Sequence, residues 1–217
     1  MSDSRIVFYF DCASAFSYIG FEFMEKYKAL WGVSVDYRPI VLSRVMSNAS
    51  NSFSPYKLPH LLQDLKRTSL ITGIPFNGVP ANYAYDPTVA LRTLQFIKTH
   101  LPDDKLTQAM RRLWHMEYVD RRAPESTDDI KYALADIIDT NIVDEALGAA
   151  DTLDALSANI EDVKHRRGFG APTILVYKSG GATQPQVFFG SDRFEHIAFY
   201  LGKEFHTMKQ LFANPRI

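Results

Sequence analysis

The sequence has little cysteine: Cys12 stands alone among 217 residues. A single thiol cannot form an internal disulfide, complete a C-x-x-C pair or build a zinc site from thiolates, so disulfide exchange within the chain is excluded. No two of the six histidines have the H-E-x-x-H or H-x3-H spacing that would place two imidazoles on one helical face. The sequence therefore predicts no metal site.

An excess of charge of one sign and long apolar runs are also missing. Lysine and arginine number 24 against 25 aspartate and glutamate residues, which gives a formal net charge of -1. A chain without a basic field does not attract nucleic acid or an anionic membrane, and no apolar run approaches the ~20 residues that cross a bilayer. We expect a small-molecule partner, with no nucleic acid and no membrane span.

The two ends of the sequence carry little targeting information. No presequence is evident before the first apolar residues. The ending Pro215-Arg216-Ile217 only loosely resembles the small-basic-leucine peroxisomal signal. We expect a soluble intracellular protein, cytoplasmic by default, with the mitochondrion and the peroxisome left open.

The N-terminal part of the sequence has the pattern of a β-α-β unit. Residues 6–10 are apolar and rich in β-formers, which predicts a buried central strand. Apolar residues then recur at spacings of three and four over 16–30, which predicts a helix. Alternation over 33–37 before Pro39 predicts a second strand. Strands joined in this way run parallel.

The middle of the sequence is different in kind. Residues 47–55 are rich in serine and asparagine, which marks a surface loop and a candidate domain boundary. From there to about residue 167 the apolar residues show helical periodicity only. We expect helices over residues 57–72, 87–100, 103–121, 126–139 and 152–167.

The C-terminal part returns to strand patterns. Residues 173–177 are apolar and β-branched, a Ser-Gly-Gly turn follows, and a second short run at 187–189 completes a predicted hairpin. A last helix is expected over 192–201, where Asp192 and Glu195 have the spacing of a capping box.

This order of elements is that of a thioredoxin-like α/β fold. A β-α-β half and a β-β-α half stand at the two ends of the chain, and an all-helical domain is inserted between them. We therefore expect residues 1–55 and 168–217 to form the thioredoxin-like domain and residues 56–167 to form the inserted helical domain.

Residues 11–17, Asp-Cys-Ala-Ser-Ala-Phe-Ser, lie where the first strand ends and a helix begins. Ligands bind at such strand ends in open α/β sheets, and a helix N-terminus favours an anion. Ser14 could hold a thiolate there, because a hydroxyl that donates to a negative sulfur lowers the thiol pKa. Serine is also a favoured N-cap, so Ser14 or Ser17 could simply cap the helix. Cys12 shares strand parity with Phe10, which predicts a buried core residue.

Two further segments could bind an extended peptide. A cis bond between Ala171 and Pro172 would turn the preceding backbone groups toward a ligand, whereas an ordinary strand entry is the alternative. At the last helix, the amides of Gly190 and Ser191 could bind a carboxylate while Asp192 pairs with an ammonium group. Capping of the helix by Asp192 is the simpler explanation of this pattern.

Several short pieces of the sequence match one protein family in order over most of the chain. They are Phe8-Tyr9-Phe10-Asp11, Ser14-x-x-Ser17-Tyr18-x-Gly20-Phe21-Glu22, Arg38-Pro39, Asp64-Leu65-Lys66, Gly73-Ile74-Pro75, Phe169-Gly170-x-Pro172 and Phe189-Gly190-Ser191-Asp192-Arg193. In this combination the chain resembles the kappa-class glutathione transferases. These are thioredoxin-like proteins in the group that contains bacterial disulfide oxidoreductases and 2-hydroxychromene-2-carboxylate isomerase.

The resemblance implies a site for glutathione, bound as a co-substrate without a metal. It implies that Ser14 faces the sulfur, that Ala171 before a cis Pro172 pairs with the cysteinyl backbone, and that Ser191 and Asp192 hold the γ-glutamyl end. The full set of implied contacts is Ser14, Ala15, Phe16, Asn51, Pro55, Lys57, Ala171, Pro172, Ser191 and Asp192.

The implied activity is conjugation of the glutathione thiolate to small electrophiles, a detoxification reaction, by a homodimer. The family commonly has Ser-Pro-Tyr where this chain has Ser14-Ala15-Phe16, so a proline and a phenolic hydroxyl are missing beside the thiolate. The isomerase branch usually has Gly-Asn-Asp-Arg where this chain has Gly190-Ser191-Asp192-Arg193, which ranks the transferase first and the isomerase second. A thioredoxin-like binding or chaperone module without turnover is the third alternative.

Overall fold

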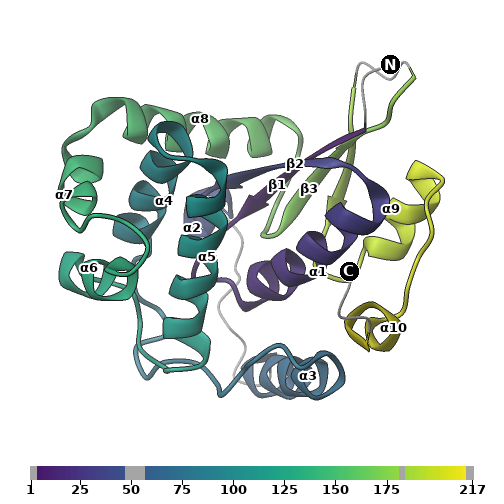
Figure 1. Cartoon of the computed structure of the whole chain (residues 1–217), viewed down its shortest axis with the longest axis horizontal. Helices are drawn as coiled ribbons and strands as arrows, with labels where there is room; N and C mark the ends of the chain where they lie inside the picture. The colour runs from purple at the N-terminus through teal and green to yellow at the C-terminus, as the bar shows by residue number, and fades with distance from the viewer. Residues whose placement is uncertain (1–3, 47–56, 181–183, 214–217) are drawn as a thin grey trace.

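The protein is built around a four-stranded mixed sheet. A computed structural model describes residues 4–46, 57–180 and 184–213 (Figure 1). The strand order is β2-β1-β3-β4, so β1 is central, as the sequence predicts. β1 pairs parallel with β2 and antiparallel with β3, and β3 pairs antiparallel with β4. The strands are β1 (Arg5–Phe10), β2 (Ser34–Pro39), β3 (Thr173–Tyr177) and β4 (Gln186–Phe189).

The other regular elements of the described chain are helices. They are α1 (Ala15–Trp31), α2 (Leu42–Val45), α3 (Lys57–Thr72), α4 (Thr88–His100), α5 (Asp103–Tyr118), α6 (Thr127–Leu134), α7 (Asn141–Gly148), α8 (Ala150–His165), α9 (Phe194–Leu201) and α10 (Met208–Ala213). Within these residues no helix has the length and apolarity needed to cross a membrane. The order of elements is that of a thioredoxin-like α/β fold with helices inserted between β2 and β3.

The sheet separates two groups of helices. Phe8, Ile174 and Phe188 share one face by register. This face packs on α1 and on α9, where the Phe188 ring contacts that of Tyr200. A Cβ on Gly20 of α1 would lie 3.2 Å from the Phe8 ring, so a helix and a strand approach closely there. Tyr9 is on the opposite face, where its hydroxyl donates to Asp162 of α8. Figure 1 shows α8 and the neighbouring inserted helices on that side.

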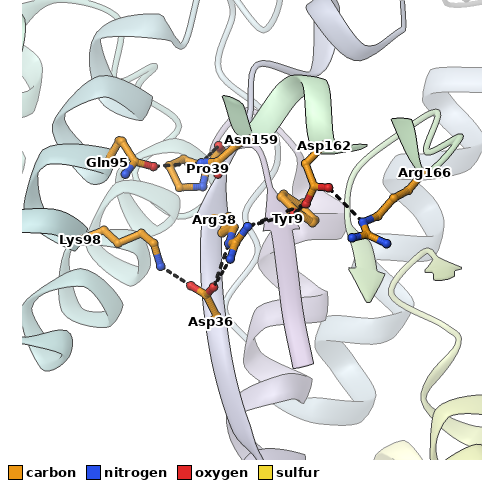
Figure 2. A network of polar contacts seen from close by, with 9 residues as sticks. All are labelled: Tyr9, Asp36, Arg38, Pro39, Gln95, Lys98, Asn159, Asp162 and Arg166. Atoms are coloured by element: carbon orange, nitrogen blue, oxygen red, sulfur yellow. Dashed lines mark hydrogen bonds and ion pairs between the residues drawn. The ribbon is translucent and has the colours of Figure 1, made fainter. Parts of the chain in front are cut away.

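Polar contacts fix the inserted helices to the sheet (Figure 2). On β2, Asp36 pairs with Lys98 of α4 and, at 2.8 Å, with Arg38 on its own strand. The Arg38 guanidinium reaches Asp162 of α8 at 3.8 Å, and Tyr9 donates to the same carboxylate. These groups are only partly exposed, so the charges are less screened than on an open surface. Burial works to raise the pKa values of Asp36 and Asp162, but both lie below their usual range. Lys98 and Arg38 lower the pKa of Asp36, and the hydrogen bonds from Tyr9 and Arg166, with the charges of Arg166 and Arg38, lower that of Asp162.

The described residues between β2 and β3 form helices and no strand, as expected from their periodicity. One cluster of buried hydrophobic side chains includes members from the sheet, such as Phe10, and from the inserted helices, such as Trp114. The division into a domain of residues 1–55 and 168–217 and a domain of residues 56–167 therefore stays a prediction.

The observed helices differ from the predicted ones in several places. The segment predicted as one helix over 126–139 ends at Leu134, and α7 follows as a separate helix that was not predicted. The short helices α2 and α10 were not predicted either. The predicted start of the last helix was also wrong, because α9 begins at Phe194 rather than at Asp192. Short helices carry few periodic positions, so the pattern alone does not reveal them.

Candidate functional site

The sheet topology brings the three candidate segments together. Because β1 and β3 are antiparallel and β3 and β4 are antiparallel, one end of the sheet holds the end of β1, the start of β3 and the end of β4. Ser14 follows β1, Ala171 precedes β3, and Ser191 follows β4. Residues that are distant in sequence therefore meet at the edge where open α/β sheets bind ligands.

Ser14 has two neighbours that define its role. It is the N-cap of α1, and its Oγ accepts a hydrogen bond from the amide of Ser17 at 3.1 Å. The same Oγ donates to the carbonyl oxygen of Ala171 at 3.4 Å, a long and weak contact. A hydroxyl has one donor and two acceptor positions, so capping leaves its hydrogen free to turn toward a ligand. The two readings of Ser14, as a cap and as a thiolate ligand, are thus compatible.

Asp11 and Cys12 shape the turn that presents Ser14. The Asp11 carboxylate accepts from the amides of Ala13 at 2.8 Å and Leu42 at 2.7 Å, which ties the turn to the start of α2. Burial raises the pKa of Asp11 to about 6 despite these bonds. Cys12 is 1% exposed, and burial raises the pKa of its thiol, so it is the buried core residue that strand parity predicts.

The Ala171–Pro172 bond is cis, as the resemblance implies. Both residues are buried, and the carbonyl of Pro172 accepts from the amide of Gly190 at 3.0 Å. This contact holds the segment before β3 beside the segment after β4. The carbonyl of Ala171 is turned toward Ser14, so backbone and hydroxyl face one another across the site.

The capping box predicted for Asp192 and Glu195 is absent. Arg193 is the N-cap of α9, and no side chain caps this helix. Gly190 has a φ of +105° and its missing Cβ makes room for the Asp192 carboxylate, since a Cβ would lie 2.6 Å from Oδ1. The Asp192 side chain is therefore folded back beside Gly190 and pairs with Arg193 at 2.9 Å. Ser191 is 9% exposed, next to this open carboxylate.

The remaining predicted contacts are less informative. Ala15 is 4% exposed and Phe16 is partly buried in the first turn of α1, where the first amides have no intrahelical acceptor. Lys57 is exposed at the start of α3. Asn51 and Pro55 lie outside the described residues.

Sequence reasoning missed a buried acid near the Ser14 turn. Glu117 of α5 is 0% exposed, and its Oε2 accepts from the hydroxyl of Tyr85 at 2.7 Å. Burial raises the pKa of Glu117 to about 8, helped by the nearby charge of Asp11, and the charge of Glu117 in turn raises the pKa of Cys12. Glu117 continues the helical face of the buried Trp114 at a spacing of three, so an acid at a core position was the available signal. Below about pH 8 this acid is held neutral, which removes a negative charge from near the turn.

Comparison with known families identifies the fold. A family model described as a DSBA-like thioredoxin domain matches residues 5–202. The chain belongs to this family. A DSBA-like domain whose only cysteine is the buried Cys12 has no pair of thiols for disulfide exchange within the chain.

Two relatives from Caenorhabditis elegans are similar along nearly their whole lengths. "Glutathione S-transferase kappa 1" is 29% identical over 204 residues and covers 89% of each chain. "Glutathione s-transferase kappa 2" is 26% identical over 220 residues, which cover 94% of this chain and 95% of that one. Among solved structures, 2-hydroxychromene-2-carboxylate isomerase has a TM-score of 0.72 at 21% identity and covers 91% of this chain and 94% of its own. At that identity the likeness shows the fold alone.

Proposed function

We propose that this protein is a glutathione transferase of the kappa type. The observation that carries the proposal is the 3.4 Å contact between the Ser14 hydroxyl and the carbonyl oxygen of Ala171, beside the cis Pro172. This contact puts a hydrogen-bond donor next to backbone that could pair with an extended tripeptide. The names and coverage of the two nematode relatives support the same function.

Glutathione would lie across the end of the sheet. Its cysteinyl backbone would pair with Ala171, while its sulfur faces Ser14 and the first amides of α1. The γ-glutamyl end would lie at Ser191 and Asp192, where the exposed carboxylate can bind the ammonium group. Lys57 offers a positive charge for the glycine carboxylate. Asn51 and Pro55, which the resemblance adds to the contacts, lie outside the described residues.

The chemical role of Ser14 is to stabilise a thiolate. When the thiol loses its proton to water, the hydroxyl can leave the weak contact with Ala171 and donate to the charged sulfur. A hydrogen bond to a charged group contributes ~1.5 to 3 kcal/mol, and one pKa unit corresponds to about 1.4 kcal/mol. The thiol pKa of ~8.5 would therefore fall by about one to two units, which makes the thiolate abundant near neutral pH.

Conjugation then needs no further acid or base from the protein. With chlorodinitrobenzene, the thiolate electron pair forms a bond to the ring carbon that carries chlorine. The carbon–chlorine bond breaks, and chloride leaves with its bonding electrons. Ala15 and Phe16 replace the proline and tyrosine of the family pattern, so no phenolic hydroxyl from that position assists the sulfur. We expect glutathione binding to be less affected by this replacement than the rate of conjugation.

Three measurements on the purified protein separate the candidate functions. Isothermal titration measures glutathione binding, the absorbance of the dinitrophenyl product measures conjugation, and spectrophotometry of a chromene carboxylate measures isomerisation. Binding with conjugation supports the transferase, whereas binding with isomerisation and without conjugation replaces it by the isomerase. Absence of glutathione binding at millimolar concentration would reject both enzymes and leave a binding or chaperone module.

The homodimer stays part of this proposal. Size-exclusion chromatography with light scattering at micromolar protein concentration should give twice the chain mass of 24.7 kDa. A monomeric mass under these conditions would reject the dimer without affecting the glutathione site.

A further inference from the structure

A hydrogen-bonded pair of buried side chains connects the inserted helices to the turn after β1. Glu117 of α5 is fully buried, and its Oε2 accepts from the hydroxyl of Tyr85 at 2.7 Å. Tyr85 lies in the loop of residues 73–87 that precedes α4, and it is 8% exposed. The same hydroxyl is within hydrogen-bond reach of the Cys12 thiol. One phenolic group therefore lies between an acid of α5 and the turn that presents Ser14.

The surroundings of Glu117 disfavour its charged form. Burial, the largest effect, and the charge of Asp11 raise its pKa, whereas the hydroxyls of Tyr85 and Tyr118 lower it. Burial and then the charge of Glu117 raise the pKa of Tyr83, which lies in the same loop as Tyr85. Helices α1, α4 and α6 also pack on α5, but within the described residues no lysine, arginine or histidine pairs with Glu117. The carboxyl therefore stays neutral up to about pH 8.

The charge of Glu117 is felt at the turn that presents Ser14. Burial raises the pKa of the Cys12 thiol, and the charges of Asp11 and then Glu117 raise it further. The turn is tight, because the amide of Ser14 donates to the carbonyl oxygen of Asp11 at 3.1 Å. All three residues of the turn are buried. Like charges in a water-excluded region oppose each other's ionisation, so a carboxylate at Glu117 disfavours a thiolate at Ser14.

We infer that Glu117 sets the upper pH limit of thiolate binding: its neutral form permits a negative sulfur at Ser14, and its charged form opposes one. This inference rests on the proposed function, because it concerns the sulfur of glutathione at the same site. Glu117 acts through its charge and makes no contact with the ligand. Above about pH 8, either Glu117 takes up a proton from solvent when the thiolate binds, or the thiolate binds near a second negative charge. Both alternatives lower the affinity for the thiolate as pH rises.

The test compares two ligands that differ in the charge of the sulfur. In the proposed complex glutathione binds as a thiolate, whereas S-methylglutathione carries a neutral thioether on the same tripeptide. The other titrating groups of the two ligands are the same, so the ratio of their affinities reports on the sulfur. Isothermal titration of both ligands between about pH 6.5 and 9.5 gives this ratio at each pH.

Glu117→Gln removes the charge and retains a side-chain oxygen that can accept from Tyr85. Below about pH 7 the ratio of affinities should be the same in wild type and variant, because Glu117 is neutral there. Above about pH 9 the wild type should favour glutathione about three- to tenfold less than the variant does, which corresponds to about half to one pKa unit of repulsion. Equal ratios in the two proteins over the whole pH range would overturn the inference.

A second variant keeps the test independent of how well Glu117→Gln folds. Tyr85→Phe removes a hydroxyl that favours the charged carboxylate, so the wild-type loss of preference for glutathione should begin at higher pH in this variant. A loss that begins at the wild-type pH would assign it to another group and overturn the inference.

Glu125→Gln is the matched control. Glu125 is exposed, and its carboxylate accepts from Asn82 of the same loop at 2.8 Å. Water screens an exposed charge, so this variant should keep the wild-type dependence of the ratio on pH. If Glu125→Gln changes the ratio as much as Glu117→Gln does, burial of the acid is not the cause, and the inference is wrong.

The two ligands also separate the inference from the function on which it rests. If wild-type protein binds neither compound at millimolar concentration, the glutathione site is wrong, and the role of Glu117 is rejected with it. If the wild type binds both compounds and the ratio of affinities does not depend on Glu117 at any pH, only the role of Glu117 is wrong.

Discussion

The starts of helices α1 and α9 lie at the same end of the sheet in different surroundings. Ser14, before α1, is 7% exposed, whereas the side chain of Asp192, before α9, is 63% exposed. Hydrogen bonds to charged groups strengthen where water is excluded, so a buried hydroxyl suits a thiolate. An exposed carboxylate suits an ammonium group that keeps part of its hydration. The two helix starts therefore suit the two ends of the proposed ligand.

The two helix starts also differ in how they are capped. Ser14 accepts from the amide of Ser17, whereas α9 has no side-chain cap and Asp192 pairs with Arg193 instead. At α1, one hydroxyl serves both stability and the proposed chemistry. At α9 the two are separate, so a substitution there should change binding alone. Substitutions near the two helix starts therefore test whether the two differ in this way.

The largest effect is expected from the buried acids near the start of α1. Glu117 has a pKa of about 8 in the folded protein against 4.5 normally, so the folded chain keeps a proton that the unfolded chain releases. The free energy of unfolding should therefore fall as pH rises through this window and level off above about 8. Asp11 has a pKa of about 6, and the pKa of His115 is lowered. Both groups therefore change the free energy of unfolding mainly at lower pH.

Urea unfolding of wild type and Glu117→Gln between about pH 6.5 and 8 measures this effect. The wild type should lose ~1.4 kcal/mol per pH unit at the steepest point, and Glu117→Gln should show no such loss. Glu161→Gln, at an exposed residue paired with Lys164, should keep the wild-type slope. If the free energy of unfolding falls with pH equally in wild type and Glu117→Gln, the raised pKa of Glu117 is not coupled to folding. The start of α1 would then not differ from that of α9 in this respect.

The next largest effect is expected from Ser14→Ala. The pKa of the bound glutathione thiol should rise by about one to two units, and turnover near neutral pH should fall about ten- to a hundredfold if thiolate attack limits the rate. Loss of the cap should also cost ~1 kcal/mol of stability. Ultraviolet thiolate absorbance of bound glutathione against pH, with thermal unfolding, measures the two effects separately.

Ser126→Ala is the control for capping. Ser126 caps α6 in a capping box with Asp129, far from the site in sequence, so its loss should lower stability by a similar amount. The thiol titration should not move in this variant. Identical thiolate titrations of Ser14→Ala and wild type would reduce Ser14 to a cap, even if the variant were slow.

The smallest effect is expected from Asp192→Asn. Loss of an exposed charge should weaken glutathione binding about two- to fivefold, in keeping with the modest strength of exposed ion pairs. The unfolding midpoint should stay unchanged because Asp192 caps nothing. Asp144→Asn, which removes an exposed acid paired with Lys131, should leave binding unchanged. Isothermal titration measures glutathione binding by both variants. If Asp192→Asn loses stability but binds glutathione normally, Asp192 stabilises the start of α9 as Ser14 stabilises that of α1.

Much of the fold follows from local patterns in the sequence. The apolar run of β1, the helical spacing of α1 and the hairpin of β3 and β4 predict elements that the structure contains within one or two residues. These patterns work because each element buries a stripe whose period its own backbone sets. Local rules failed at α9, where the positive φ of Gly190 turns Asp192 away from the helix that its sequence spacing suggests it caps.

The site itself depends on contacts that no local pattern contains. Ser14 and Ala171 are 157 residues apart in sequence, so their contact could be expected only from the topology or from a resemblance. Glu117 shows the opposite case, since its place on the buried face of α5 follows from spacing. Glu117 is neutral because burial raises its pKa. The raised pKa of an acid cannot be predicted from its residue type alone.

The distance in sequence between Ser14 and Ala171 has a thermodynamic consequence. A site assembled from both ends of the chain exists only when the whole sheet is formed, so an unfolded chain offers the ligand nothing comparable. Any ligand that binds there must therefore shift the folding equilibrium by mass action, by ~2.7 kcal/mol at a concentration a hundred times its Kd. The occupancy of this site and the lifetime of the folded chain are thus linked, whatever reaction follows.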